Sequence, residues 1–224
     1  MSETLESLTV VLGDRSGSMT NYGNFDNLKS TILDRMNKGV EDSKAGRLGR
    51  LILISFDHEC DVVMDKSYSE IDDSDRKALD EWFKPRGTTA FYDGVIKSIE
   101  WVQRYDAVNK IVVLVTDGLE NASVIPNAQK RAQSAIEYAK KSNVSVFLVG
   151  DQDCLKEQQS ELKMVDPKMV LPLSRQGSTT LQRVVTSCAH GNPAFFTLKD
   201  QMKAMRRIRS WPAAKKPRST ILLK

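Results

Sequence analysis

The stretch VVLGDRSGSMT, residues 10–20, changes character at one point. Its first half is the apolar end of a strand, and its second half presents Asp14, Ser16 and Ser18 at alternate positions. A polar turn does not need this order. One carboxylate and two hydroxyls in this spacing supply the oxygen ligands that a hard cation prefers. The stretch therefore predicts a buried strand that ends in part of a metal site.

Other runs of almost continuous Val, Ile and Leu follow along the chain. Strands buried on both faces of a parallel sheet have this composition, whereas a strand with one wet face would alternate. Two weaker runs, 60–67 and 168–174, fit edge strands, and Pro172 in the second is tolerated at an edge. The first of these follows a buried run closely, as in a tight hairpin. The expected buried strands are 7–13, 50–56, 110–116 and 144–150.

Helical patterns lie between these strands. Apolar residues recur there at three- and four-residue spacing, as on a helix with one buried face. Ser74 and Asn127 are candidate N-caps. The order of elements predicts a Rossmann-like α/β fold: a doubly wound, mostly parallel sheet of about six strands, with one short antiparallel edge strand and helices on both faces. The expected helices are 24–37, 74–83, 91–105, 127–142 and 178–188.

Two further segments offer oxygen ligands. Asp117 follows the strand 110–116, and the segment RGTTAFYDG contains Thr88 and Thr89 after a glycine. Because ligands bind beyond the carboxyl ends of the strands in doubly wound sheets, we expect these groups to meet Asp14 at one sheet edge. The set contains no thiolate or imidazole, which favours Mg²⁺, with Mn²⁺ as a substitute, over zinc or copper. Since only two carboxylates offset its charge, the ion would accept an acidic side chain from another molecule in place of a water.

Taken together, the three segments resemble the von Willebrand factor A-type (VWA) domain family. Its metal-ion-dependent adhesion site (MIDAS) is written Asp-x-Ser-x-Ser, then a Thr in a Gly-containing loop, then an Asp usually followed by Gly. The likeness covers about residues 5–190 and favours Thr89 over Thr88. It implies a VWA-type fold that binds proteins through a Mg²⁺ bridge to a partner's Asp or Glu. The implied metal ligands are Asp14, Ser16, Ser18, Thr89 and Asp117.

The rim of this site is where we expect partner specificity. Residues that leave the same strand ends as the ligands would line it, and aromatic side chains there are favoured at binding surfaces. An alternative interpretation is that the aromatic residues after Thr89 pack beneath their helix and that the acidic residue after Asp117 is an ordinary solvated charge. The predicted rim residues are Tyr22, Tyr92, Glu120 and Asn121.

Charge divides the 224-residue chain into two regions. From residue 191 onward there are nine Lys or Arg and one acidic residue, whereas the rest of the chain is mildly acidic and the overall charge is +4. We therefore predict a VWA-like domain over 1–190 and a basic extension over 191–224. The extension fits a helix packed on the body with a solvated tail, an arm that docks on an acidic protein surface, a nucleic-acid contact or a membrane contact.

Composition also bears on location. No run of eighteen apolar residues predicts a membrane span, and the first residues, MSETLESL, lack the basic, apolar pattern of a classical secretion signal. Three widely spaced cysteines, Cys60, Cys154 and Cys188, fit reduced thiols better than disulfides. We expect a cytoplasmic protein, or one within an intracellularly assembled particle.

Catalysis is not expected. GDRSGSM is not the Gly-x-Ser-x-Gly of a nucleophilic serine, and only His58 and His190 are available as a base. The chain has neither a dinucleotide fingerprint nor a phosphate-binding loop. The favoured function is metal-dependent protein binding for adhesion or assembly. The alternatives are a structural component of a phage, virus or intracellular complex anchored by the basic tail, and a metal-dependent hydrolase.

Overall fold

A six-stranded sheet forms the centre of the computed structural model, which describes residues 4–118, 120–150, 165 and 169–172, and at Tyr22 the backbone alone. The strand order is β3-β2-β1-β4-β5-β6. All neighbours are parallel except β2 and β3, which form an antiparallel hairpin. The strands are β1 (Leu5–Asp14), β2 (Gly49–Phe56), β3 (Cys60–Ser67), β4 (Ala107–Thr116), β5 (Val144–Gly150) and β6 (Val170–Pro172).

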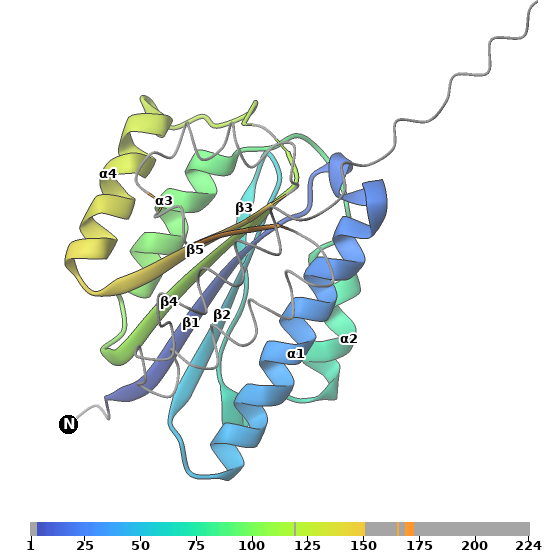
Figure 1. Cartoon of the computed structure of the whole chain (residues 1–224). Coiled ribbons are helices and arrows are strands. Elements are labelled where there is room, and N and C mark those ends of the chain that lie inside the picture. Colours follow the sequence, from blue (N-terminus) through green and yellow to red (C-terminus); the bar gives the residue numbers. More distant parts are fainter. Residues whose placement is uncertain (1–3, 119, 151–164, 166–168, 173–224) are drawn as a thin grey trace, which may run out of the picture. The chain divides into compact units, whose positions relative to one another are not determined.

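Helices cover both faces of the sheet (Figure 1), with α3 and α4 on one face and α1 and α2 on the other. This confirms the predicted doubly wound α/β fold with a mostly parallel sheet and one antiparallel edge strand. The α-helices are α1 (Asn24–Lys44), α2 (Asp73–Trp82), α3 (Phe91–Val102) and α4 (Ala128–Lys141), and two short 3₁₀ helices are η1 (Gly17–Gly23) and η2 (Tyr68–Glu70).

The central strand β1 is buried from Ser7 to Asp14 because it has a strand on each side and helices on each face. Its alternate residues Leu8, Val10 and Leu12 join the core cluster beneath α3 and α4. Residues between them face α1, where the Arg35 Nε donates to Thr9 Oγ1 at 3.3 Å. This two-sided burial explains the continuous apolar run that the sequence shows.

The order of strands places a topological switch point at β1. The connection through α1 leads to β2 on one side of β1, whereas the later connection leads to β4 on the other side. In register, Gly13 lies beside Val115, so β1 and β4 end at the same edge of the sheet. The residues that follow them, Asp14 and Thr116, lie where such folds bind ligands.

Several predicted boundaries need correction. The first helix continues beyond residue 37 to Lys44, and the cap of α2 is Asp72, whose side chain accepts from the amides of Ser74 and Asp75. Asn127 does hold the N-cap position of α4, but its φ is 55° and its side chain makes no capping bond. The predicted helix 178–188 and the basic extension 191–224 lie outside the described residues.

Within the described ranges, no helix combines the length and apolar character that a bilayer crossing requires.

Candidate metal centre

Asp14 ends β1 with its side chain fully buried. Its Oδ1 accepts the amide of Ser16 at 2.6 Å, and its Oδ2 accepts the hydroxyl of Thr116 at 2.5 Å. The first bond curls the chain so that Ser16 and Ser18 turn back toward the strand end. The second joins the ends of β1 and β4.

Two serines and Asp117 form a connected row of oxygens beside Asp14. The Oγ atoms of Ser16 and Ser18 are 3.0 Å apart, and the Ser18 hydroxyl donates to Asp117 Oδ1 at 2.7 Å. The other oxygen of Asp117 accepts the side-chain amide of Asn24, at the start of α1, at 2.8 Å. The row therefore joins the segment after β1 to the segment after β4.

Thr89 approaches the same row from the loop before α3. A Cβ placed on Gly118 would lie 3.2 Å from Thr89 Oγ1 and 3.3 Å from Ser18 Oγ, so both hydroxyls flank this glycine. Thr89 is buried, whereas Thr88 is exposed. The structure thus brings together the oxygens of all the predicted ligand residues, which are Asp14, Ser16, Ser18, Thr89 and Asp117.

The electrostatics of this site are unbalanced. Burial raises the pKa of Asp14 to about 6, and the nearby charge of Asp117 adds to the effect, although hydrogen bonds from Thr116 and Ser16 oppose it. Both carboxylates are buried, yet no ion pair among the described residues includes either of them. A buried carboxylate normally has a cationic partner or coordinates a metal.

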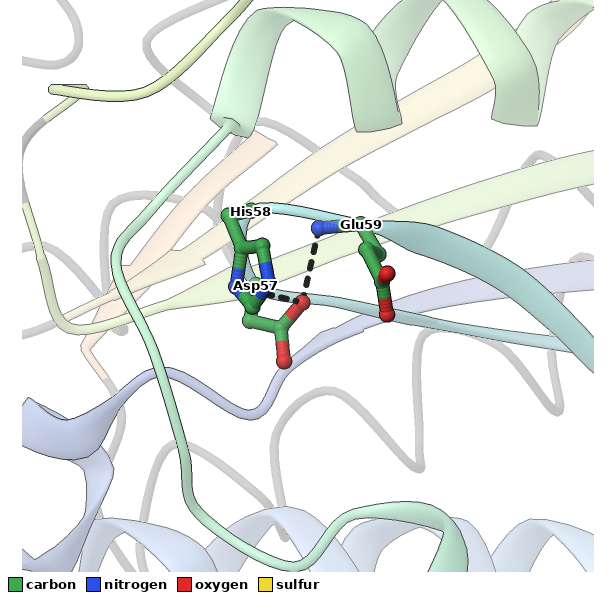
Figure 2. A group of neighbouring side chains, drawn as sticks. All are labelled: Asp57, His58 and Glu59. Carbon is green, nitrogen blue, oxygen red and sulfur yellow. Dashed lines mark hydrogen bonds and ion pairs between the residues drawn. The ribbon is translucent and has the colours of Figure 1, made fainter.

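A second group of potential ligands, drawn in Figure 2, lies in the turn between β2 and β3. One potential ligand atom from each of Asp57, His58 and Glu59 lies within 4.8 Å of the others. Asp57 is fully buried, and its Oδ2 already binds Arg15 at 3.1 Å and Arg86 at 2.7 Å. Two guanidinium groups therefore supply the positive charge that an ion would bring.

The pKa of Asp57 reflects this pairing. Burial alone would raise it, but the amide of Glu59 and the two arginines outweigh burial, so the pKa lies below its usual value. Glu59 in turn accepts from Arg86 Nη2 at 2.7 Å. With Asp57 and Glu59 both neutralised by arginine, the chemistry of this turn suits an ion-paired structural cluster rather than a metal site.

The predicted rim residues have different fates. Tyr92 is only 7% exposed and its ring lies 6.2 Å from that of Phe91, so the structure corrects its placement on an open rim. It is buried because it occupies the first turn of α3, where the helix packs on the core. For Tyr22, the side chain lies outside the described part of the chain.

The other two rim residues shape the loop before α4. Glu120 accepts from the amides of Tyr92, Ala122 and Ser123 and from the Ser123 hydroxyl. Asn121 exchanges two hydrogen bonds with the backbone of Thr89, at 2.9 and 3.0 Å. Both side chains are therefore engaged within the chain, and Asn121 fixes a predicted metal ligand. Their contact with a partner stays a prediction.

Sequence reasoning missed two residues that support the ligands, Thr116 and Asn24. Thr116 had a detectable signal, because it directly precedes Asp117 at the end of a strand and must lie beside Asp14 if β1 and β4 are neighbours. Nothing in the sequence singles out Asn24, since a polar residue at the start of a helix is common.

Comparison with known proteins adds to this geometry. A family model described as the von Willebrand factor type A domain matches residues 9–202. No curated protein sequence matches the chain.

Solved structures share the fold at low identity. The vWF domain of the type V pili tip protein Mfa5 from Porphyromonas gingivalis is 14% identical with a TM-score of 0.65, over 85% of this chain and 96% of that domain. The pilus adhesin SpaC from Lactobacillus rhamnosus GG is 12% identical with a TM-score of 0.59, over 85% of this chain and 31% of SpaC. The chain spans about half (48%) of a three-domain Mfa5 structure.

A third similar structure is proximal thread matrix protein 1 from the mussel byssus, described with zinc in its MIDAS motif. It is 19% identical with a TM-score of 0.57, over 83% of this chain and 48% of that one. At these identities the likeness shows the fold alone.

Proposed function

The chain belongs to the von Willebrand factor type A domain family, and from this premise we propose that it is a protein-binding module that engages its partner through a divalent cation. The proposed cation is Mg²⁺, with Mn²⁺ as a substitute, and the module binds rather than catalyses. When bound, the ion supplies a positive charge with coordination positions that a partner's Asp or Glu can occupy. The proposed ligands are Asp14, Ser16, Ser18, Thr89 and Asp117.

The observation that carries this proposal is a contrast at one edge of the sheet. Asp57 is buried there between two arginines. Asp14 and Asp117 are buried nearby and close enough for the charge of one to raise the pKa of the other, but no described ion pair includes them. Because two neighbouring buried carboxylates repel, an added cation would stabilise the pair.

The types of ligand atom indicate which cation the site would bind. Carboxylate and hydroxyl oxygens suit a hard ion such as Mg²⁺, whereas zinc prefers nitrogen and sulfur ligands. Zinc in the MIDAS motif is described for the mussel byssus protein, and we do not extend it to this chain.

The expected partner is a protein with an exposed acidic residue. Relatives by fold include a pilus tip protein, a pilus adhesin and a byssus matrix protein, and their descriptions agree with a role in adhesion or assembly. The basic extension, 191–224, would dock on an acidic surface of the same assembly through its excess of Lys and Arg. The family and these relatives support binding as the general role; the partner is part of our proposal.

The proposal is tested by Asp117→Ala. Mn²⁺ binding followed by electron paramagnetic resonance should weaken at least a hundredfold, because the variant loses one of two anionic ligands. In a crosslinking pull-down from native extract, the proteins that wild type captures with Mg²⁺ but not with EDTA should be lost as well. The circular dichroism spectrum should stay unchanged, since the residue lies at the end of a strand and not in the core cluster.

The matched control is Asp80→Ala on α2. The Asp80 side chain is 74% exposed and pairs with Lys29. Its substitution therefore removes one acidic charge without altering any predicted ligand. Unchanged Mn²⁺ affinity in Asp117→Ala, or an equal loss of affinity in Asp80→Ala, would contradict the proposed metal bridge.

A further inference from the structure

One buried carboxylate binds both of the loops that carry hydroxyl ligands. We define the first loop as residues 14–18 and the second loop as residues 86–89. Asp57 Oδ2 accepts from Arg15 Nε of the first loop at 3.1 Å and from Arg86 Nε of the second loop at 2.7 Å. Asp57 itself belongs to neither loop and is fully buried in the turn after β2.

Backbone bonds cross the same junction. The Arg86 amide donates to Arg15 O at 2.6 Å, and the Gly17 amide donates to Gly87 O at 3.3 Å. The Ala90 amide, just beyond the second loop, donates to Asp57 O at 2.6 Å. The turn at Asp57 therefore contacts the second loop through its side chain and the residue that follows this loop through its backbone.

The charges at this junction depend on Asp57. Two guanidinium groups converge on one carboxylate oxygen, and without it they would face each other with no shared anion. Their outer nitrogens bind separate acids: Arg15 Nη2 lies 2.6 Å from Asp61, and Arg86 Nη2 lies 2.7 Å from Glu59. Both of these acids are half-exposed, so the buried charge of Asp57 contributes most to holding the arginines together.

We propose that Asp57 is a positioning residue of the metal centre. Its carboxylate holds the two loops at the spacing that places Ser16 and Ser18 opposite Thr89. This inference rests on the proposed metal-binding function, although Asp57 does not bind the ion. Groups that orient metal ligands without touching the metal typically change metal affinity ten- to a hundredfold when they are altered.

The test compares Asp57→Asn with Asp65→Asn. Asp65 also pairs with an arginine, Arg50, at 2.5 Å, but this pair joins β3 to β2 near the start of β2, far along the strand from the loops. The dissociation constant for Mn²⁺, measured by electron paramagnetic resonance, should rise ten- to a hundredfold in Asp57→Asn and stay within twofold in Asp65→Asn. An unchanged affinity in Asp57→Asn, or an equal loss in both variants, would overturn the proposal.

Hydrogen exchange of the metal-free protein gives a readout that does not need the ion. The amides of Gly17, Arg86 and Ala90 should exchange at least tenfold faster in Asp57→Asn and at the wild-type rate in Asp65→Asn. If the wild-type protein binds no Mn²⁺, the proposed metal-binding function fails. The hydrogen-exchange measurement then still decides whether Asp57 joins the two loops. Unchanged exchange in Asp57→Asn would show that it does not.

A second variant covers the case in which Asp57→Asn does not fold. The Arg86 side chain is half-exposed, so Arg86→Gln removes the bond from the second loop with less disturbance of the core. We expect its Mn²⁺ dissociation constant to rise at least threefold, with faster exchange at Arg86 and Ala90. Wild-type values for both quantities would count against the proposal.

Discussion

Two carboxylates set the properties of the candidate metal centre. Asp14 and Asp117 lie close together in a buried setting, and the groups that bind them are hydroxyls and amides rather than cations. Hydrogen bonds of this kind orient a carboxylate but offset only part of its charge. Burial therefore still raises the pKa of Asp14 to about 6 despite these hydrogen bonds.

This pKa predicts a pH dependence of metal binding. A proton and a cation compete for Asp14, and with a pKa of about 6 the group is mostly protonated at pH 5 and mostly ionised at pH 7.5. The Mg²⁺ affinity should therefore fall about tenfold between pH 7.5 and pH 5. Calorimetric titration at several pH values measures it, and a flat profile down to pH 5 would contradict the role of Asp14.

At this scale the sequence predicted the ligands but not their supports. Asp14, Ser16 and Ser18 are recognisable because their spacing is local. The supports depend on contacts between distant residues: Thr116 meets Asp14 across 102 positions, and Arg15 meets Asp57 across 42. No local pattern marks such pairs: Thr116 could be inferred only through the pairing of β1 with β4, and the buried ion-paired turn became visible only in the structure.

The length of α1 illustrates what apolar spacing leaves out. The predicted helix ended at residue 37, just after Met36, the last apolar position counted for it, whereas the helix continues to Lys44. In the additional part, Gly39 lies against Tyr68 of η2, so the backbone itself provides the contact surface. A glycine that packs closely because it has no side chain does not contribute to a pattern of apolar side chains, so that pattern cannot detect it.

That contact predicts the effect of Gly39→Ala. Alanine normally favours a helix over glycine by up to about 1 kcal/mol. Here, however, a Cβ would lie 2.0 Å from Tyr68 Cδ1, and overpacking of this kind costs about 1–3 kcal/mol. We expect the free energy of unfolding, measured in urea, to fall by roughly 1–2 kcal/mol, since the clash outweighs the helical preference.

The control for this prediction is Gly17→Ala in metal-free protein. An added Cβ there would lie 3.7 Å from the nearest neighbouring atom, which is an ordinary contact. Its stability should stay close to that of wild type. Equal or higher stability of Gly39→Ala would mean that Tyr68 moves aside at little cost.

The whole molecule places its ligands at a position that the strand order determines. Continuous apolar strands and alternating helices were sufficient to predict a doubly wound sheet, and the switch point at β1 then brings the ends of β1 and β4 together. The basic extension and the helix expected over 178–188 lie outside the described residues, so their predictions stay untested.

Binding of an ion at this position should stabilise the entire domain. At a Mg²⁺ concentration one hundred times the dissociation constant, linkage adds about 2.7 kcal/mol to the free energy of unfolding. For a chain of this size the melting temperature should rise by about 5–10 °C. Scanning calorimetry with Mg²⁺ and then with EDTA tests this. A rise that persists in Asp117→Ala would place the stabilising ion elsewhere.

The hairpin strand β3 affects whether copies of the molecule associate through the edges of their sheets. It is one of the two edge strands of the described sheet, and such edges can recruit a strand from a neighbouring chain and begin aggregation. β3 carries Asp61, Asp65 and Lys66, and its pairing with β2 shifts register at Leu53. Charges and bulges of this kind discourage intermolecular sheet extension. The edge at β3 is therefore protected against pairing with a strand from another copy of the molecule.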